Sequence, residues 1–77
     1  MSVIYLEKRD PARNQNRYYS ILVSRTLFGQ WTMIREWGRI GQSGTVRETW
    51  YDTENEAMEA GEKLAKQKQQ RGYKTVG

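Results

Sequence analysis

The spacing of hydrophobic and polar residues predicts strands over the first two-thirds of the chain. Residues 3–8 form an apolar run, and residues 17–25 form a near-continuous run of β-branched and aromatic side chains. Two further strands are expected over residues 31–40 and 46–51. Between these runs lie stretches rich in turn-forming residues, at 10–16, 26–29 and 41–44.

The hydrophobic period changes after residue 51 and predicts one helix over 54 to about 70. Its apolar side comprises Ala57, Met58, Gly61, Leu64 and Ala65. Thr53 and Glu56 have the spacing of a capping box, and Gly72 is placed to end the helix. The acidic residues of this segment precede its basic ones, which complements the helix dipole.

These elements predict an α+β fold: a small antiparallel β-sheet of about four strands with one C-terminal helix packed on one face. We expect residues 1–77 to form a single domain. Hydrophobic residues make up only 36% of the chain, but three tryptophans and five tyrosines can supply a core. We expect Trp50 to be one of the core residues.

The composition argues against several classes of function. The chain has no Cys and no His, so thiolate and imidazole metal sites are absent, and no carboxylate pair stands out for acid–base catalysis. We expect no enzyme activity, no metal and no cofactor. The chain shows neither a signal peptide nor an apolar stretch long enough for a membrane span, and we expect a cytoplasmic protein.

The net charge of +4 is distributed unevenly. Residues 1–50 carry eight basic residues against four acidic ones, whereas residues 51–77 carry five of each. Seven of those eight bases are arginine, which suits bidentate contacts to phosphate. A partner rich in phosphate is therefore the first expectation.

The strand over 31–40 carries the most unusual pattern. Alternation places one set of side chains on a common face: Trp31, Met33, Arg35, Trp37 and Arg39. Burying a tryptophan between two arginines is costly, so we expect the end of this face to be exposed. Trp37 could then stack on a base or sugar while the arginines hold phosphates. The alternative is that Trp37 packs in the core and the arginines reach past it to solvent. The glycines of this region match no nucleotide-binding fingerprint.

The segment Trp37-Gly38-Arg39-Ile40-Gly41, followed by Gly44, is similar to the signature of the WGR domain family. The flanking segments resemble that family in order and spacing: Leu6-Glu7-Lys8, Asn16-Arg17-Tyr18-Tyr19, Leu27-Phe28-Gly29-Gln30-Trp31, Ala57, and Lys68 to Tyr73. The resemblance covers essentially the whole chain and is to a stand-alone, bacterial-type member.

The resemblance implies DNA binding. WGR domains of poly(ADP-ribose) polymerases bind DNA at breaks and pass the signal to a catalytic domain. By position, Trp37 would pack against a nucleotide sugar at the broken end, Asn16 would contact DNA, and Arg39 would lie at the junction with neighbouring domains. This chain contains no catalytic domain, so only the DNA-binding half of the role is expected here.

Two functions stay open. The first is sequence-independent DNA binding that favours ends or nicks, through Arg13, Asn16, Arg17, Arg35, Trp37 and Arg39. The second is a protein-interaction module that uses the same Trp/Arg face, since both residue types are frequent in interface hot spots. RNA is a further possible ligand of the same surface. We expect a monomer that does not bind membranes.

Overall fold

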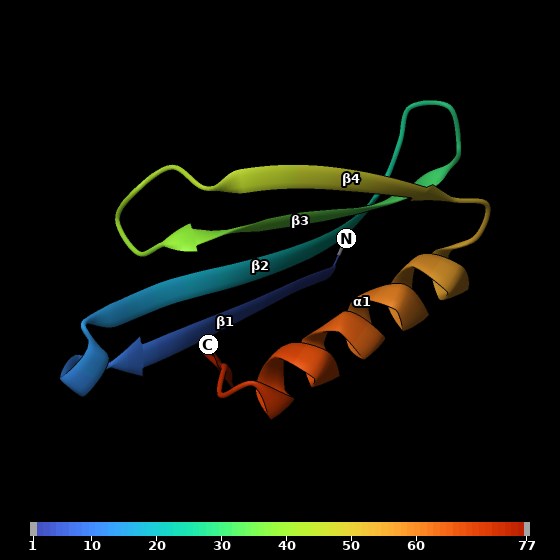
Figure 1. The fold of residues 1–77 in the computed structure, drawn as a ribbon. Helices are drawn as coiled ribbons and strands as arrows, with labels where there is room; N and C mark the ends of the chain where they lie inside the picture. Colours follow the sequence, from blue (N-terminus) through green and yellow to red (C-terminus); the bar gives the residue numbers. More distant parts are fainter. Residues whose placement is uncertain (1, 77) are drawn as a thin grey trace.

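The computed structural model describes residues 2–76, which form a five-stranded antiparallel sheet with one helix lying across one of its faces (Figure 1). The strands are β1 (Ser2–Asp10), β2 (Gln15–Arg25), β3 (Trp31–Arg39), β4 (Thr45–Tyr51) and β5 (Lys74–Thr75), in the order β4-β3-β2-β1-β5. The helix is α1 (Glu54–Gln70), and a 3-10 turn, η1 (Pro11–Arg13), joins β1 to β2. The predicted α+β fold is confirmed, with the short β5 added at one edge.

The connection between β1 and β2 is tighter than the predicted loop over 10–16. Pairing continues to the very end of the two strands, where Asp10 lies opposite Gln15. Asn14 allows this because it adopts a left-handed conformation, with φ 53°, which asparagine tolerates better than most residues. Asn16 is therefore held in a strand and does not lie in a free loop.

The core lies between α1 and the middle of the sheet. Leu6 and Ile21 are fully buried, and α1 turns its small residues Ala57, Gly61 and Ala65 toward them. A Cβ at Gly61 would lie 3.2 Å from the Cγ2 atom of Ile21, so the glycine allows the helix to approach closely. This accounts for a residue that otherwise weakens a helix interior.

Both ends of α1 are capped. The hydroxyl of Thr53 accepts a hydrogen bond from the Glu56 N–H at 3.2 Å, as the capping box predicts, and the Glu56 carboxylate accepts one from the Thr53 hydroxyl at 3.0 Å. Gly72 has φ +98° and donates to the Gln69 carbonyl, while Tyr73 donates to the Lys68 carbonyl. These two bonds form a Schellman motif, which turns the chain back toward the sheet at Tyr73.

The expectation that Trp50 belongs to the core is wrong. Its side chain is 54% exposed on the sheet face away from α1. Met33 is buried against the helix and pairs with Thr49, so Thr49 and Tyr51 share the helix side and Trp50 must point the other way. Val3 and Val46 are also exposed on that opposite face.

Substituting Ile21 and Trp50 by alanine should have unequal effects on stability. Ile21→Ala leaves a cavity under α1 and should lower the free energy of unfolding by about 2–5 kcal/mol. Trp50→Ala should cost less than about 1.5 kcal/mol, since half of the side chain is already in water. Urea unfolding followed by circular dichroism measures both. A larger loss for Trp50→Ala would contradict the assignment of the two sheet faces.

Candidate nucleic-acid interface

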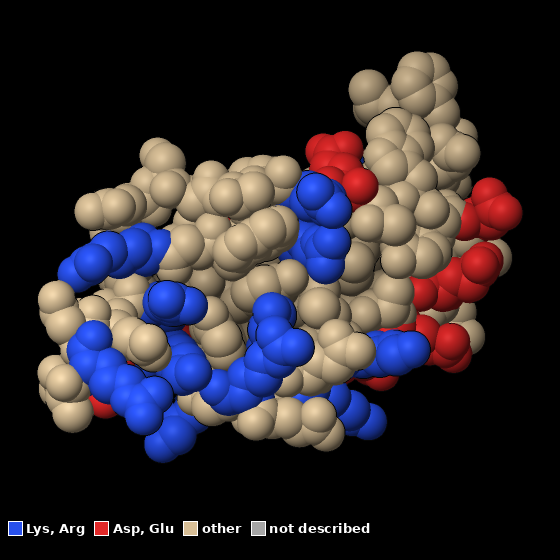
Figure 2. Space-filling view, in the orientation of Figure 1, with Lys and Arg blue, Asp and Glu red and all other residues tan. Residues whose placement is uncertain are grey.

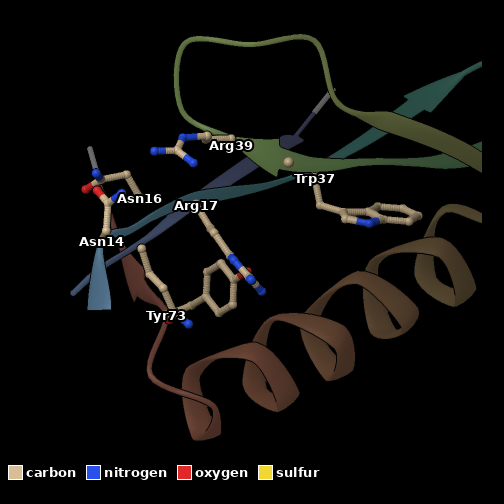
Figure 3. Close-up of a pocket in the computed structure, with 8 residues that line it drawn as sticks. Asn14, Asn16, Arg17, Trp37, Arg39 and Tyr73 are labelled. Atoms are coloured by element: carbon tan, nitrogen blue, oxygen red, sulfur yellow. The ribbon is translucent and has the colours of Figure 1, made fainter. Parts of the chain in front are cut away.

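One end of the sheet holds a cavity of about 350 Å³ (Figure 3). It forms where the β1–β2 connection, the end of β3 and the segment after α1 meet. Its wall consists of Asn14, Gln15, Asn16, Arg17, Trp37, Gly38, Arg39 and Tyr73. The Ile40 N–H donates to the Asn16 carbonyl at 2.9 Å, which holds the ends of β2 and β3 together beside the cavity.

Trp37 is held on the cavity wall by aromatic packing. Its ring stacks against that of Tyr19, its partner across the β2–β3 ladder, with centroids 5.7 Å apart and an interplanar angle of 12°. Tyr73 meets the same tyrosine edge-on at 6.2 Å. Trp37 is half-buried and packs against the core, so the expectation that it stays outside the hydrophobic interior is only partly right. Its position is intermediate between full exposure and a core tryptophan.

Three basic residues form a row across the strands next to this aromatic cluster. Lys8 lies opposite Arg17, and Arg17 lies opposite Arg39, all on the face that α1 covers. Like charges directly opposite one another destabilise a sheet. Within residues 2–76, the ion pairs are Arg9 with Glu7 and Arg13 with Asp10, so this row has no carboxylate partner. An anion bound here would relieve the repulsion.

Gly38 of β3 and Gly44 of the β3–β4 connection allow this connection to pack closely against Tyr18. A Cβ on Gly38 would lie 2.9 Å from the Cα of Gly44, and a Cβ on Gly44 would collide with the Tyr18 hydroxyl. That hydroxyl donates to the Glu36 carboxylate at 2.5 Å. The hydrogen bond to Glu36, followed by burial, raises the pKa of Tyr18. The acid of β3 is thus held on the sheet face away from the basic row.

Four of the six predicted site residues are brought together by the fold: Asn16, Arg17, Trp37 and Arg39 line the cavity. Arg13 does not line it; its side chain is largely exposed on η1, with Nε 3.7 Å from an Asp10 oxygen. Arg35 lines a second cavity, between α1 and β4.

Asn14, Gln15 and Tyr73 also line the cavity, although the sequence did not predict them as site residues. The sequence held a signal for two of them. Asn14 lies in a segment rich in turn-forming residues, and Tyr73 directly follows the glycine that ends the helix.

Charge is separated across the face that carries α1. Figure 2 shows Lys and Arg over the left and centre of this face, and Asp and Glu mainly toward the right, where the helix begins. At the basic end, Lys68 lies with its Nζ 4.7 Å from the centroid of the Tyr19 ring. Burial, followed by the positive charges of Arg71 and Arg35, lowers the pKa of Lys68 below its ordinary value of 10.5. Neither ion pair of the described residues includes Lys68 or the row formed by Lys8, Arg17 and Arg39.

The cavity combines an aromatic wall with arginine side chains, which suits a ligand that carries phosphate. The profile of the WGR domain matches residues 2–77, and the chain belongs to this family, whose members are generally nucleic-acid-binding modules. The chain is also 38% identical over 71 residues to the uncharacterized protein y4dW of Sinorhizobium fredii. That match covers 92% of this chain and 35% of the relative, so the chain spans about a third of the relative's length.

No solved structure matches the chain significantly. Within residues 2–76, no helix is long and apolar enough to cross a membrane, and no group of three or more acidic side chains is placed to hold a metal ion.

The pKa of Lys68 should respond to Arg35. Arg35→Met removes one of the two positive charges that lower this pKa, so the pKa should rise part of the way toward 10.5, with burial and Arg71 still acting. Nuclear magnetic resonance (NMR) titration of the lysine Cε signals measures the change. Arg13→Met, which removes a charge from the distant η1 turn, is the control and should leave the pKa of Lys68 where it is.

Proposed function

We propose that this protein binds DNA without reading its sequence and prefers ends or nicks. The observation that carries the proposal is the meeting, at one cavity, of a half-buried indole and two arginines, Arg17 and Arg39, that form no ion pair within residues 2–76. Trp37 packs on the sugar or base of a terminal nucleotide, Arg17 and Arg39 hold phosphates, and Asn16 contacts the backbone. Arg13 adds a phosphate contact from the rim, and the protein acts as a monomer.

The size and position of the cavity favour an end over an intact duplex. A volume of about 350 Å³ falls at the lower end of small-ligand pockets, so one nucleotide would fill much of it. In a continuous duplex each base is stacked on both sides. An end leaves one face of the terminal nucleotide unstacked, and a nick removes the covalent bond that holds its terminal nucleotide in the stack. Sequence-specific readout would require a base-reading element in the major groove. The one helix of residues 2–76 is packed on the sheet beside the cavity, which supports binding without sequence specificity.

Affinity should therefore depend on the form of the DNA end. Titration of 5′-phosphorylated nicked, blunt-ended and closed circular duplexes at two salt concentrations should give tightest binding to the first two, with affinity falling steeply as salt rises. Equal affinity for all three would remove the preference for ends.

Trp37→Leu tests the role of the indole within the same titration. Leucine keeps an apolar side chain against Tyr19 but lacks the broad ring, and loss of stacking worth ~1–3 kcal/mol should weaken end binding about 5- to 150-fold. Thermal unfolding of the variant checks that the fold survives. Unchanged end binding in a folded Trp37→Leu protein would show that the ring does not contact the nucleic acid.

Neutralising the basic row should weaken binding without unfolding the protein. Arg17→Gln and Arg39→Gln should each reduce the magnitude of the negative slope of log affinity against log salt by about 1, because each removes one phosphate contact. Stability should hold or rise, since the two cations face each other across the ladder.

Arg25→Gln is the matched control for these two variants. It removes an exposed arginine from the same face of β2 at the opposite end of the strand and should change the slope little.

If the wild-type protein binds neither DNA nor RNA at low salt but retains a protein partner after nuclease treatment, the Trp/Arg surface serves protein interaction instead.

A further inference from the structure

The groove between α1 and the edge strand β4 holds a feature that the proposed end-binding cavity does not use. Arg35 projects into this groove, and its Nε–H is buried with no hydrogen-bond partner among residues 2–76. A buried donor without a partner is unfavourable, and more so on a charged group. Neither ion pair of the described chain involves this guanidinium.

The side chains around the groove are suited to an anion. The groove has a volume of about 240 Å³, and its polar lining consists of Arg35, Thr49, Tyr51, Lys63 and Gln67. Every one of these side chains can donate a hydrogen bond, and none is acidic. Met33, Ala60 and Leu64 form the apolar part of the wall. Arg47, opposite Arg35 in the ladder on the same face, adds a further positive charge nearby.

The groove lies next to the end-binding cavity along β3. Arg35 is two residues from Trp37 on the same face, and its guanidinium carbon lies 5.5 Å from the centroid of the Trp37 ring. Two strand residues advance ~6.6 Å. Successive phosphates of one DNA strand advance ~3.4 Å along the helix axis. A strand whose terminal nucleotide sits at Trp37 could therefore place a phosphate one or two nucleotides away near Arg35.

We propose that Arg35 and Lys63 form a second phosphate site, which holds the backbone of the DNA strand whose terminal nucleotide occupies the Trp37 cavity. This inference rests on the proposed function, because the strand is positioned by the contact at Trp37. The guanidinium supplies the directional donor, and Lys63 supplies a mobile charge from the opposite wall of the groove. The lowered pKa of Lys68, to which Arg35 contributes, is consistent with a local excess of positive charge that a phosphate would reduce.

One NMR experiment on the intact protein separates the two sites. In ¹⁵N spectra, the indole N–H of Trp37 reports on the end-binding cavity, and the Nε–H of Arg35 reports on the groove. Titration with a 5′-phosphorylated nicked duplex should shift both signals with the same saturation curve. Because the Arg35 guanidinium carbon lies 5.5 Å from the Trp37 ring, direct contact between phosphate and Arg35 requires in addition the change in salt dependence described below. A shift of Trp37 alone would overturn the second site and leave the proposed function standing. A shift of neither signal, with no measurable binding, would overturn both.

Salt dependence provides a second, independent measurement. Arg35→Met and Lys63→Met should each reduce the magnitude of the negative slope of log affinity against log salt by about 1, while the preference for nicked over closed DNA remains. Lys66→Met is the control: Lys66 is an exposed lysine of the same helix that lines neither cavity, so its loss should leave the slope nearly unchanged.

A change in slope is interpretable only if the variant folds. Circular dichroism verifies the fold of each one, and Lys63→Met, on the outer side of the groove, keeps the test valid if Arg35→Met is unstable. Slopes equal to that of the wild type in both folded groove variants would overturn the proposal.

Discussion

The candidate interface depends on the position of one buried ring, that of Tyr19. Trp37 stacks on it from β3, Tyr73 meets it edge-on from the segment after α1, and the Lys68 ammonium lies above it from the helix. Tyr19 is itself only 3% exposed, so its ring has little freedom to move. The strands β2 and β3 and the C-terminal end of α1, with the segment that follows it, are thereby fixed against one another. Because the indole is already ordered, packing a ligand on it would cost the protein little side-chain conformational entropy.

Two acidic residues of the sheet, Glu7 and Glu36, lie on the face opposite the basic row. On the face away from α1, Glu36 accepts from the Tyr18 hydroxyl, and Glu7 accepts from the Tyr5 hydroxyl and pairs with Arg9. Strand alternation places both acids on that face, whereas Lys8, Arg17 and Arg39 share the other. The basic row is thus kept free of internal neutralisation. Such an arrangement costs the folded state some stability through repulsion, as functional sites often do, and it leaves the cations available to an external anion.

The sequence predicted the elements well because local signals agree with the fold. The Thr53 cap, the turn at Gly72 and the small residues facing the sheet fix α1 without long-range information. Trp50 was misplaced because alternation tells which residues share a face but not which face the helix will cover. That choice depends on Met33 and Ile21 packing against α1, a tertiary contact. Tyr73 escaped notice for a similar reason: its place at the cavity follows from the path of the chain after the helix.

The half-buried state of Trp37 explains how one residue can belong to the fold and to the site. A fully buried indole would offer no surface to a ligand, and a fully exposed one would be free to adopt several rotamers. Packing against Tyr19 removes that freedom, and the cavity leaves part of the side chain accessible. Arg35, within 6 Å of the same ring, cannot be treated as an independent surface charge for this reason. If binding moves the indole, the electrostatic environment of the Arg35 guanidinium changes with it. A single cation–π contact therefore connects the two cavities along β3.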